Sequence, residues 1–518
     1  MPTNADLREQ YEKMIKNNKL KRSQKFEAIL QSRKIRTQSG VAIIAVLTKA
    51  YRCPGKCLYC PTEKDMPKSY LSNEPAVMRA ISANFDPYRQ VQDRLKSLAI
   101  NGHQTDKIEL IVMGGTFSFL PKNYQLKFIT DCFRACNDYP RKSKTDDSRS
   151  ADKLLIKEQK KNEKTKHRIV GLTLETRPDY IDEKEIVNFR KLGCTRVELG
   201  VQSIFDEVLK KNRRGHGVSE TIRATKLLKN AGFKINYHLM PGLPGSTVKK
   251  DFAMFGEIFS NPDFQPDMLK IYPTVVIKNS ALYGVWKKGK YDALTDKQFE
   301  KLILQIKNEA IPPYVRIARL VRDVPATSIV AGPIVSNLRQ LIAHKSKCRC
   351  IRCREVGTDY DIKEKIILDR IDYRASDGKE IFLQYVSPDK KKLFALLRLR
   401  IPDCHSRENG NPVGKIKFIS LDSRLRGNDK LYKSLPALKE AAIIREVHTY
   451  GKIAEIDTVS KNSPQHIGLG KKLMAEAEKI AKREFGFTKI VVISGVGVRG
   501  YYRKLGYRKK ETYMVKDI

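Results

Sequence analysis

The sequence lacks the features of a membrane-bound or secreted protein. The longest apolar run near its start, Val41–Leu47, is far shorter than the roughly 18 residues that a membrane-spanning helix needs. The first residues are polar and contain no signal-peptide core. Ten cysteines in 518 residues are too few for a disulfide scaffold, and six of them fall in two short clusters, which is typical of metal binding in a reducing compartment. We therefore expect a cytoplasmic protein that does not bind membranes.

Acidic residues are scarce relative to basic ones. The chain has 58 Asp and Glu against 100 Lys and Arg, a formal net charge of +42. Such an excess favours a polyanionic partner, most simply a nucleic acid. Residues 1–40 carry ten basic and four acidic side chains. They predict a basic helical arm, which is either a solvated helix or a segment that contacts phosphates.

Short apolar runs alternate with helical patterns from residue 41 to about 335. This alternation predicts an α/β fold, a parallel sheet or partial (β/α) barrel with ligand-binding residues at the carboxyl ends of its strands. One helix is expected at Val218–Asn230, and the charged segment 141–168 predicts an exposed loop or helix. The expected strands are Val41–Leu47, Ile108–Met113, Ile169–Leu174, Arg196–Leu199, Lys234–Leu239 and Met268–Tyr272.

A second α/β domain is predicted over residues 361–518, after a cysteine-containing linker at 336–360. Its expected helix covers about 470–485. Residues 402–430 are rich in Arg, Asn and Gly and predict an inserted surface loop, in which Cys404 and His405 have no functional role. The expected strands are Ile381–Val386, Leu393–Arg400, Ala441–His448 and Lys489–Ile493.

Three cysteines, Cys53, Cys57 and Cys60, form a CxxxCxxC run directly after the first expected strand. Three thiolates at this spacing can hold three irons of a [4Fe–4S] cluster and leave the fourth iron open to chelate S-adenosylmethionine. The alternative is a structural zinc site, which usually has four ligands in CxxC pairs. No fourth ligand lies nearby, so the run favours radical S-adenosylmethionine chemistry.

Polar and glycine-rich motifs follow other strands. One strand ends in Gly114, Gly115 and Thr116. Two glycines let the backbone approach a ligand closely, and they predict a site for the amino group of S-adenosylmethionine. Glu175 either binds this ligand or caps the next helix, and Gln202 lies beyond another short strand. His238 is either a hydrogen-bonded core histidine, which we favour, or a ligand.

The second cluster, Cys348, Cys350 and Cys353, offers three soft ligands. A structural zinc ion at the junction of two domains is the favoured interpretation, ahead of a second redox cluster. A fourth ligand is needed, and His344 is within reach in sequence but is not favoured.

The C-terminal domain contains the motif Gln465-His466-Ile467-Gly468-Leu469-Gly470 before its amphipathic helix. Successive backbone N–H groups at a helix start can bind a pyrophosphate. With Arg445–His448 upstream and Tyr501–Tyr507 downstream, the motif resembles the coenzyme-A loop of GNAT acetyltransferases. Tyr501 or Tyr502 would be a general acid for the departing thiolate, and the other would pack against the sheet.

A radical cysteine loop and a GNAT-like domain in one chain resemble the catalytic subunit of Elongator, a tRNA uridine carboxymethyltransferase family, in its prokaryotic form. Further similar segments are Arg36–Gly40, Cys53–Pro61, Glu74–Arg79, Phe85–Tyr88, Glu198–Ser203, Lys270–Thr274 and Ile493–Gly497. The resemblance implies that the cysteine loop holds the cluster and S-adenosylmethionine. It also implies an acetyl-coenzyme A site formed by Lys107, Glu446, Val447, His448, Thr449, Leu469, Gly470, Lys471 and Tyr502.

The resemblance further implies a reaction on tRNA. A 5′-deoxyadenosyl radical would take hydrogen from the acetyl methyl group, the carbon radical would add to carbon 5 of the wobble uridine, and thioester hydrolysis would leave 5-carboxymethyluridine. An anticodon base is unpaired and can enter a pocket at little cost. The alternatives are a protein lysine acetyltransferase with a structural cluster and a non-catalytic RNA-binding protein. A homodimer, accessory subunits and the electron donor are left open by the sequence.

Overall fold

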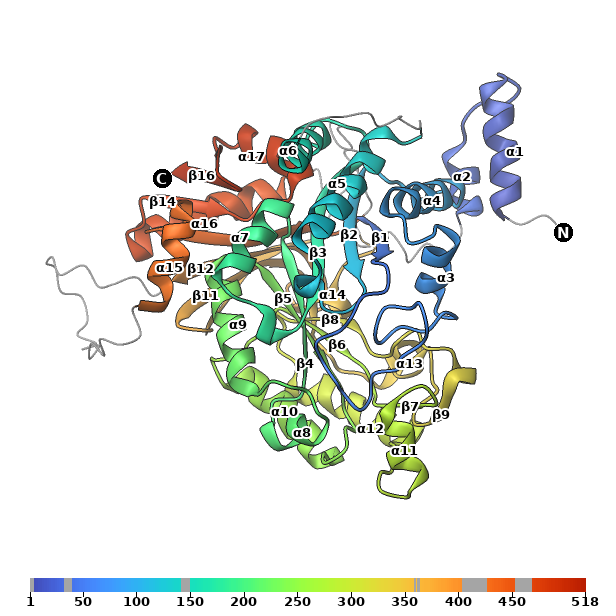
Figure 1. Ribbon diagram of the computed structural model, residues 1–518. Coiled ribbons are helices and arrows are strands. Elements are labelled where there is room, and N and C mark those ends of the chain that lie inside the picture. Colours follow the sequence, from blue (N-terminus) through green and yellow to red (C-terminus); the bar gives the residue numbers. More distant parts are fainter. Residues whose placement is uncertain are drawn as a thin grey trace, which may run out of the picture.

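The computed structural model describes residues 4–31, 40–140, 150–357, 360, 364–402, 426–451 and 468–518. Two seven-stranded sheets and the helices around them form the body of the molecule (Figure 1). No helix in these ranges is both long and apolar enough to cross a membrane.

The first sheet has the order β1-β2-β3-β4-β5-β6-β8, and all of its neighbouring strands are parallel. This confirms the predicted α/β half-barrel, including all six expected strands. The seventh strand, β8, was not predicted, because Arg316-Ile-Ala-Arg319 has one fully buried apolar residue. The strands are β1 (Ala42–Leu47), β2 (Lys107–Met113), β3 (Arg168–Thr176), β4 (Arg196–Gln202), β5 (Lys234–Leu239), β6 (Met268–Ile271) and β8 (Arg316–Arg319).

Amphipathic helices cover the outer face of this sheet (Figure 1). A helix occupies Val218–Asn230 as predicted, because Glu220 bonds back to the Gly217 N–H at its start and Gly232, at φ +86°, follows its end. The charged segment after residue 141 forms α6 (Ala151–Asn162), which packs on α5. The other long helices of this layer are α4 (Pro87–Ile100), α5 (Lys122–Asp138), α7 (Glu183–Leu192), α10 (Val248–Ser260) and α12 (Asp296–Gln305).

The second sheet has the order β10-β11-β12-β13-β14-β16-β15. Its one parallel pair joins Ala442–Ile444 to Ile490–Val492, after which β13 separates from β14 and continues to Thr449 paired with β12 only. Helix α16 (Leu469–Phe485) packs on β12 and β13. The strands are β10 (Ile367–Arg374), β11 (Gly378–Val386), β12 (Leu393–Pro402), β13 (Ala442–Thr449), β14 (Lys489–Val492), β15 (Arg508–Lys510) and β16 (Tyr513–Asp517).

Two predicted segments lie at the limits of the description. The expected inserted loop begins where β12 ends, and α15 (Arg426–Ser434) begins within it. Residues 403–425, with Cys404 and His405, lie outside the described residues. At the other end of the chain, α1 (Asn4–Lys16) and α2 (Gln24–Leu30) form a helical pair that projects from the body beside α4 (Figure 1).

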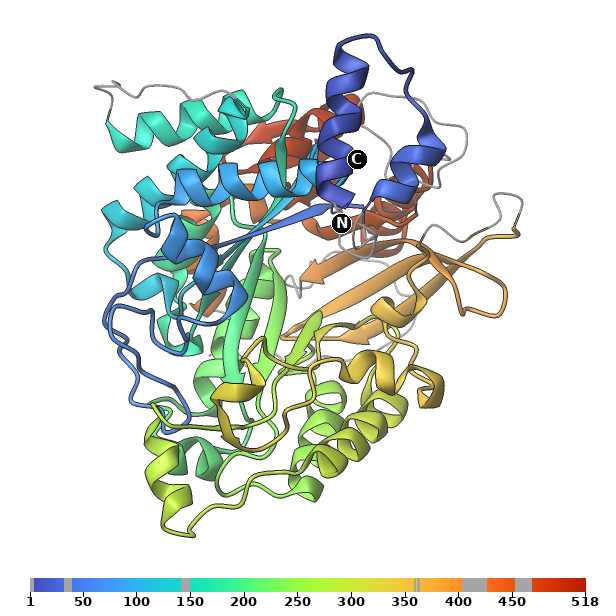
Figure 2. The ribbon, with the colours of Figure 1, turned by 90° about the vertical axis from the view of Figure 1, so that its right-hand side faces the viewer.

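The second sheet packs against the amino-terminal edge of the first (Figure 2). The turn η8 (Val496–Val498) lies on the start of β3. A Cβ atom at Gly495 would come within 2.0 Å of the Val170 carbonyl oxygen, and one at Gly497 within 2.6 Å of Arg168 Cβ. Backbone therefore meets backbone here, which only glycine allows.

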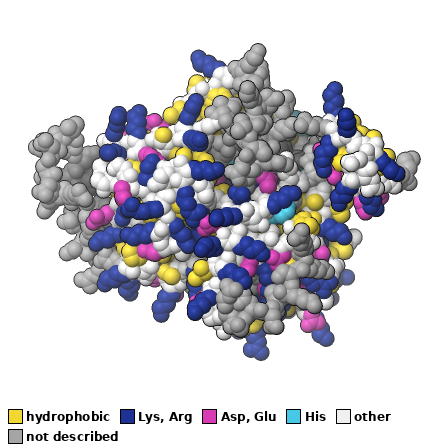
Figure 3. Space-filling model, turned by 90° about the horizontal axis from the view of Figure 1, so that it is seen from above, with side chains coloured by type: hydrophobic (Ala, Val, Ile, Leu, Met, Phe, Trp, Pro, Cys, Tyr) yellow, Lys and Arg dark blue, Asp and Glu magenta, His cyan; other side chains and the backbone are white. Residues whose placement is uncertain are grey.

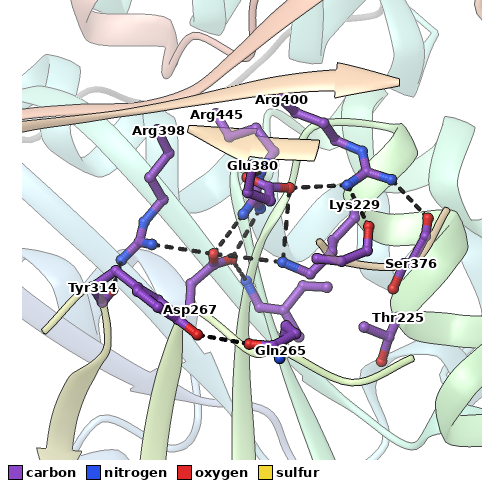
Figure 4. Close-up of polar contacts among 12 residues, drawn as sticks. Thr225, Lys229, Gln265, Asp267, Tyr314, Ser376, Glu380, Arg398, Arg400 and Arg445 are labelled. Atoms are coloured by element: carbon purple, nitrogen blue, oxygen red, sulfur yellow. Dashed lines mark hydrogen bonds and ion pairs between the residues drawn. The ribbon is translucent and has the colours of Figure 1, made fainter. Parts of the chain in front are cut away.

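A buried ion network joins the two sheets (Figure 4). Asp267, just before β6, bonds through Oδ2 to Arg445 Nη1 on β13 at 2.9 Å and to the Ile235 N–H on β5 at 2.9 Å. Burial would raise the pKa of Asp267, but the charges of Arg445, Lys229 and Arg398 outweigh it and hold the pKa well below its ordinary value.

The second carboxylate of the network is Glu380 on β11. It bonds to Arg400 Nη1 at 3.0 Å and to Arg445 Nε at 3.1 Å. Lys229 lies 3.7 Å from Asp267 and 3.8 Å from Glu380, and burial lowers its pKa to about 8. The docking of the two sheets is therefore set by charged groups that have no contact with solvent.

We predict that Asp267→Asn lowers the free energy of unfolding by about 3 kcal/mol, because it leaves the buried Arg445 and Lys229 charges uncompensated. Urea unfolding followed by circular dichroism measures this. The matched control is Asp263→Asn, which changes an exposed carboxylate four residues away and should alter the stability by less than about 0.5 kcal/mol. Equal stability of the two variants would contradict a structural role for the network.

Candidate active site

The cysteine loop leaves β1 and is held by backbone bonds at its centre. The Leu58 N–H donates to the Asn212 carbonyl at 3.1 Å, and the Leu58 carbonyl accepts from Leu282 N–H at 2.8 Å. Cys57 is buried, whereas Cys53 and Cys60 are partly exposed. The loop thus presents its sulfurs at the carboxyl edge of the first sheet, as the sequence predicted.

A buried arginine supports the thiolates. Arg214 donates from Nη1 to Cys57 Sγ at 3.5 Å and from Nη2 to the Gly200 carbonyl. A hydrogen bond with Cys60 lowers the pKa of Cys57 to about 4; the adjacent Arg214 charge adds to this, against the effect of burial. A cation beside anionic sulfur ligands fits a [4Fe–4S] cluster, whose sulfurs are tuned by hydrogen bonds.

The ends of β1 and β2 approach each other closely beside this loop. Gly114 has φ +129° and Gly115 has φ +95°, a region that favours glycine. A Cβ atom at Gly114 would come within 2.0 Å of Thr48 Oγ1. Thr116 follows and is buried. Glycine at position 114 therefore allows β1 and β2 to end in close contact beside the cysteine loop.

Charged side chains meet at the ends of β3 to β6. His238 Nε2 lies 2.9 Å from Glu198 Oε2, and its Nδ1 lies 3.6 Å from Glu175 Oε1. Lys270 also pairs with Glu198, and the Tyr70 hydroxyl donates to Glu175 at 2.8 Å. Burial opposes ionisation of Glu198, but Lys270 and His238 hold its pKa well below the ordinary value. His238 is hydrogen-bonded, as favoured from the sequence, and it is part of this network.

Several buried polar atoms in this region have no partner among the described residues. They are Gln202 Oε1, Thr274 Oγ1 and the Tyr59 hydroxyl. Gln202 also has φ +72° at the end of β4. Unpaired buried polar groups are costly and usually mark a ligand or water. The cysteine loop, the glycine pair and these atoms fit S-adenosylmethionine on a three-cysteine cluster, which would supply one-electron reductive cleavage to an organic radical.

The second cysteine cluster lies between the two sheets. Among the described residues, the three-cysteine group whose sulfurs all lie within 4.8 Å of one another is Cys348, Cys350 and Cys353. Backbone bonds tie this segment to both sides, from Ile351 N–H to the Val315 carbonyl and from Val356 N–H to the Leu393 carbonyl. Lys307 Nζ lies 3.6 Å from Cys353 Sγ. His344 is exposed and is not part of the group. Three close sulfurs fit zinc.

The residues predicted to hold acetyl-coenzyme A gather around the start of α16. Gly468 has φ +78° and precedes the helix. A Cβ atom at Gly470 would lie 3.2 Å from the Tyr501 hydroxyl oxygen, 3.9 Å from Thr449 Cγ2 and 4.0 Å from Val447 Cγ1. Leu469 and Lys471 open the helix beside them, while Gln465 lies outside the described residues. The start of α16 therefore adjoins β13 beyond the point where β14 ends.

The two tyrosines differ in environment. Tyr501 is half-buried, and burial raises its pKa to about 12. Tyr502 is buried and packs between Tyr501 and Tyr507, with ring centres 5.3 and 6.0 Å apart. Tyr501 is the one whose hydroxyl adjoins Gly470.

Glu446, His448 and Lys107 lie where this site meets the first sheet. The Glu446 carboxylate pairs with Lys234 at 3.0 Å and Arg398 at 2.9 Å, so its side chain is committed to the interface. The His448 ring lies 4.4 Å from Tyr450. Lys107 is the first residue of β2, beside Arg168, and burial lowers its pKa.

The two predicted sites lie at opposite ends of the same strands. On β5, Lys234 contacts Glu446, whereas His238 belongs to the network near the cysteine loop. Four residues of strand separate them, or about 13 Å. The half-barrel therefore lies between a candidate coenzyme-A site and a candidate radical site.

Sequence reasoning missed several residues of these sites. Arg214 and Tyr70 carry no motif, and they reach the site only through the tertiary fold. Lys307 was missed for the same reason. A buried cation beside a cysteine cluster has no signal in a single sequence, because its partner is distant along the chain.

Comparison with known proteins places these features in families. Residues 47–255 match the Radical SAM superfamily, and residues 266–347 match the Radical SAM C-terminal domain. A protein of Methanocaldococcus infernus named tRNA uridine(34) acetyltransferase is 46% identical over 508 residues, which cover 95% of this chain and 88% of that protein. A protein of the same name from Dehalococcoides mccartyi is 42% identical over 490 residues, which cover 93% of this chain and 99% of that protein.

More distant relatives extend to eukaryotes. Human Elongator complex protein 3 is 37% identical over 510 residues, covering 94% of this chain and 86% of the human protein. The solved structure of the archaeal Methanocaldococcus infernus Elp3 with an N-terminal deletion superimposes with a TM-score of 0.73 at 42% identity, covering 93% of this chain and all of that one.

We predict that the two cysteine clusters bind different metals. Cys57→Ser should abolish iron incorporation after anaerobic reconstitution and leave zinc in place, because it removes one of three cluster ligands. Cys350→Ser should do the reverse and also lower stability, since structural zinc contributes to folding. Elemental analysis of both proteins checks this, each variant being the control for the other. Retention of iron by Cys57→Ser would refute the ligand assignment.

Proposed function

The chain belongs to the family of the tRNA uridine(34) acetyltransferases and Elongator complex protein 3, and from this premise we propose that it modifies the wobble uridine of tRNA. The proposed product is 5-carboxymethyluridine, with acetyl-coenzyme A as the acyl donor. The observation that carries the proposal is the arrangement of two candidate sites around one half-barrel. The cysteine-loop network contacts the end of β5 through His238, and Glu446 of the second sheet contacts its start through Lys234.

The radical half would use the residues at the carboxyl edge. Cys53, Cys57 and Cys60 would hold the cluster, with Arg214 compensating the charge of its sulfurs. Gly114, Gly115 and Thr116 would receive the amino group of S-adenosylmethionine, and Gln202 and Glu175 would bind its other polar groups. Glu198, Lys270 and His238 would keep the neighbouring polar surface fixed before the substrate enters.

The acyl half would use the opening of β13 beyond Ile444. The N–H groups of Gly468 to Lys471 would bind the pyrophosphate of coenzyme A, as helix starts bind anions. The pantetheine arm would be lined by Val447, His448 and Thr449. Glu446 would contribute only its backbone, because its carboxylate is paired with Lys234 and Arg398. We assign the general-acid role to Tyr501, which adjoins this helix start, and a packing role to Tyr502.

The basic surface supports tRNA as the substrate. The face in Figure 3 shows Lys and Arg side chains spread over the molecule with few acidic ones among them. Contacts of this kind with phosphates supply affinity that falls steeply with salt. A lysine acetyltransferase acting on peptides would have no need of a net charge of +42.

We predict that Tyr501→Phe lowers the rate of coenzyme A release by roughly 100-fold, the lower range for loss of a general acid. The affinity of the Tyr501→Phe protein for acetyl-coenzyme A should stay the same, since only the hydroxyl is removed. Tyr502→Phe, the matched control one residue away, should keep the rate within about 2-fold. Coenzyme A release measured with a thiol reagent separates the two. If Tyr502→Phe has the larger effect, the assignment of Tyr501 is wrong.

The proposed function is tested by reconstituting the protein with iron and sulfide under anaerobic conditions. It is then incubated with S-adenosylmethionine, dithionite, labelled acetyl-coenzyme A and tRNA, and the nucleosides are analysed by mass spectrometry. Labelled 5-carboxymethyluridine is the expected result. Label on protein lysines without labelled uridine would replace the proposal with lysine acetylation.

A further inference from the structure

A cavity of about 840 Å³ lies against the cysteine loop. One wall is Pro54, Gly55 and Lys56, between the first two cluster cysteines, and the opposite wall is the segment from Arg213 to Gly217. The lining also includes Arg177, Tyr180 and Lys210. This volume is typical of a site for a nucleotide-sized ligand.

The cavity has an unbalanced positive charge. Its two carboxylates are already used: Asp179 is held by Arg177 through two bonds of 2.9 and 2.7 Å, and Asp206 accepts from the Val218 N–H at 2.8 Å. Lys56, Lys210 and Arg213 are exposed. No carboxylate of the described part of the chain pairs with any of these three, so they are available to an anion.

Two buried arginines add unpaired donors to this wall. Arg177 and Arg214 are each 5% exposed, and Arg177 Nη1 and Arg214 Nε have no partner among the described residues. Glycines make room for the first of them, since a Cβ atom at Gly55 would lie 2.3 Å from Arg177 Nη1 and one at Gly215 would lie 3.3 Å from Nη2. Buried N–H groups without partners indicate an absent acceptor.

Two further groups indicate a nucleotide rather than a bare anion. The Tyr180 ring is half-buried in the lining and offers a face for stacking. His216 Nδ1 lies 3.0 Å from the Gly217 carbonyl, so this nitrogen carries the proton and Nε2 is an acceptor without a partner. An unpaired acceptor suits a ribose hydroxyl, which RNA has and an acidic protein surface lacks.

We propose that this cavity binds a nucleotide of the substrate RNA, with its phosphate on Lys210, Arg213 and Arg177, and so fixes the strand beside the cluster. The proposal rests on the proposed function, because a tRNA base must reach the cofactor on the cysteine loop. Arg214 links the two directly, since it lines the cavity and donates to Cys57.

The test compares Lys210→Ala/Arg213→Ala with Lys153→Ala/Lys160→Ala. The second pair is the control, because it removes the same charge from exposed positions of α6. Helix α6 lies at the far end of the molecule from α8 (Asp206–Lys211), the helix that carries Lys210 (Figure 1). Affinity for an anticodon stem–loop RNA with uridine at the wobble position is measured at several salt concentrations. RNA-free cleavage of S-adenosylmethionine by dithionite is measured in parallel.

The cavity variant should bind the RNA several-fold more weakly. Its plot of log affinity against log salt should be shallower by about 0.7, because one single-strand phosphate contact contributes about 0.7. The α6 variant should keep the wild-type slope. Equal slopes for the two variants would overturn the proposal.

Two other results would also overturn it. A raised KM for S-adenosylmethionine without RNA would assign the cavity to that cofactor. Unchanged RNA binding, with a loss of activity only when an acidic flavin or iron–sulfur protein replaces dithionite, would assign it to the electron donor. Failure of the wild-type protein to modify uridine at all would instead count against the proposed function, so the two failures are distinguishable.

Discussion

The carboxylate of Asp267 fixes the relative position of the two halves of this protein. It bonds to the Ile235 N–H at the start of β5 and to Arg445 on β13, while Arg445 also donates to the Phe233 carbonyl. The network contains more buried cations than carboxylates, and main-chain carbonyls such as that of Tyr314 accept some of their N–H groups. Buried ion pairs add little net stability, because desolvation offsets their attraction. Their effect is directional: a shift in the register of β13 on the half-barrel would separate Arg445 from both Asp267 and the Phe233 carbonyl.

That register has a chemical consequence. The residue after Arg445 is Glu446, which pairs with Lys234, and Val447 and Thr449 beyond it lie beside Gly470 at the candidate coenzyme-A site. Lys234 begins the strand that ends near His238 and the cysteine loop. The candidate coenzyme-A site and the candidate radical site are thus positioned by one strand, on which Lys234 and His238 lie about 13 Å apart. A flexible pantetheine arm would suit this arrangement, because it could carry an acetyl group along the half-barrel from one candidate site to the other.

Sequence patterns predicted the local elements well and the long-range contacts poorly. Val218–Asn230 and Lys234–Leu239 were predicted to the residue, because apolar periodicity and flanking glycines mark both. Strand β8 was missed because it is short and begins and ends with arginine, and the partner that lets Arg316 be buried, Glu355, is distant along the chain. The cysteine clusters were found by spacing alone. Their supporting cations were not, since Arg214 lies 157 residues from Cys57 and nothing in one sequence links the two.

Those cations change how the net charge should be interpreted. Arg214 beside Cys57, Lys307 beside Cys353, and Lys229, Arg398, Arg400 and Arg445 between the sheets are all buried. A zinc ion on three thiolates carries one net negative charge, which the Lys307 ammonium would balance. Part of the +42 is therefore buried beside internal acidic groups and the two cysteine clusters, and is not displayed to solvent. The charge that an RNA meets is carried by the remaining exposed side chains, and among these the unpaired cations of the cavity at the cysteine loop lie nearest to the radical chemistry.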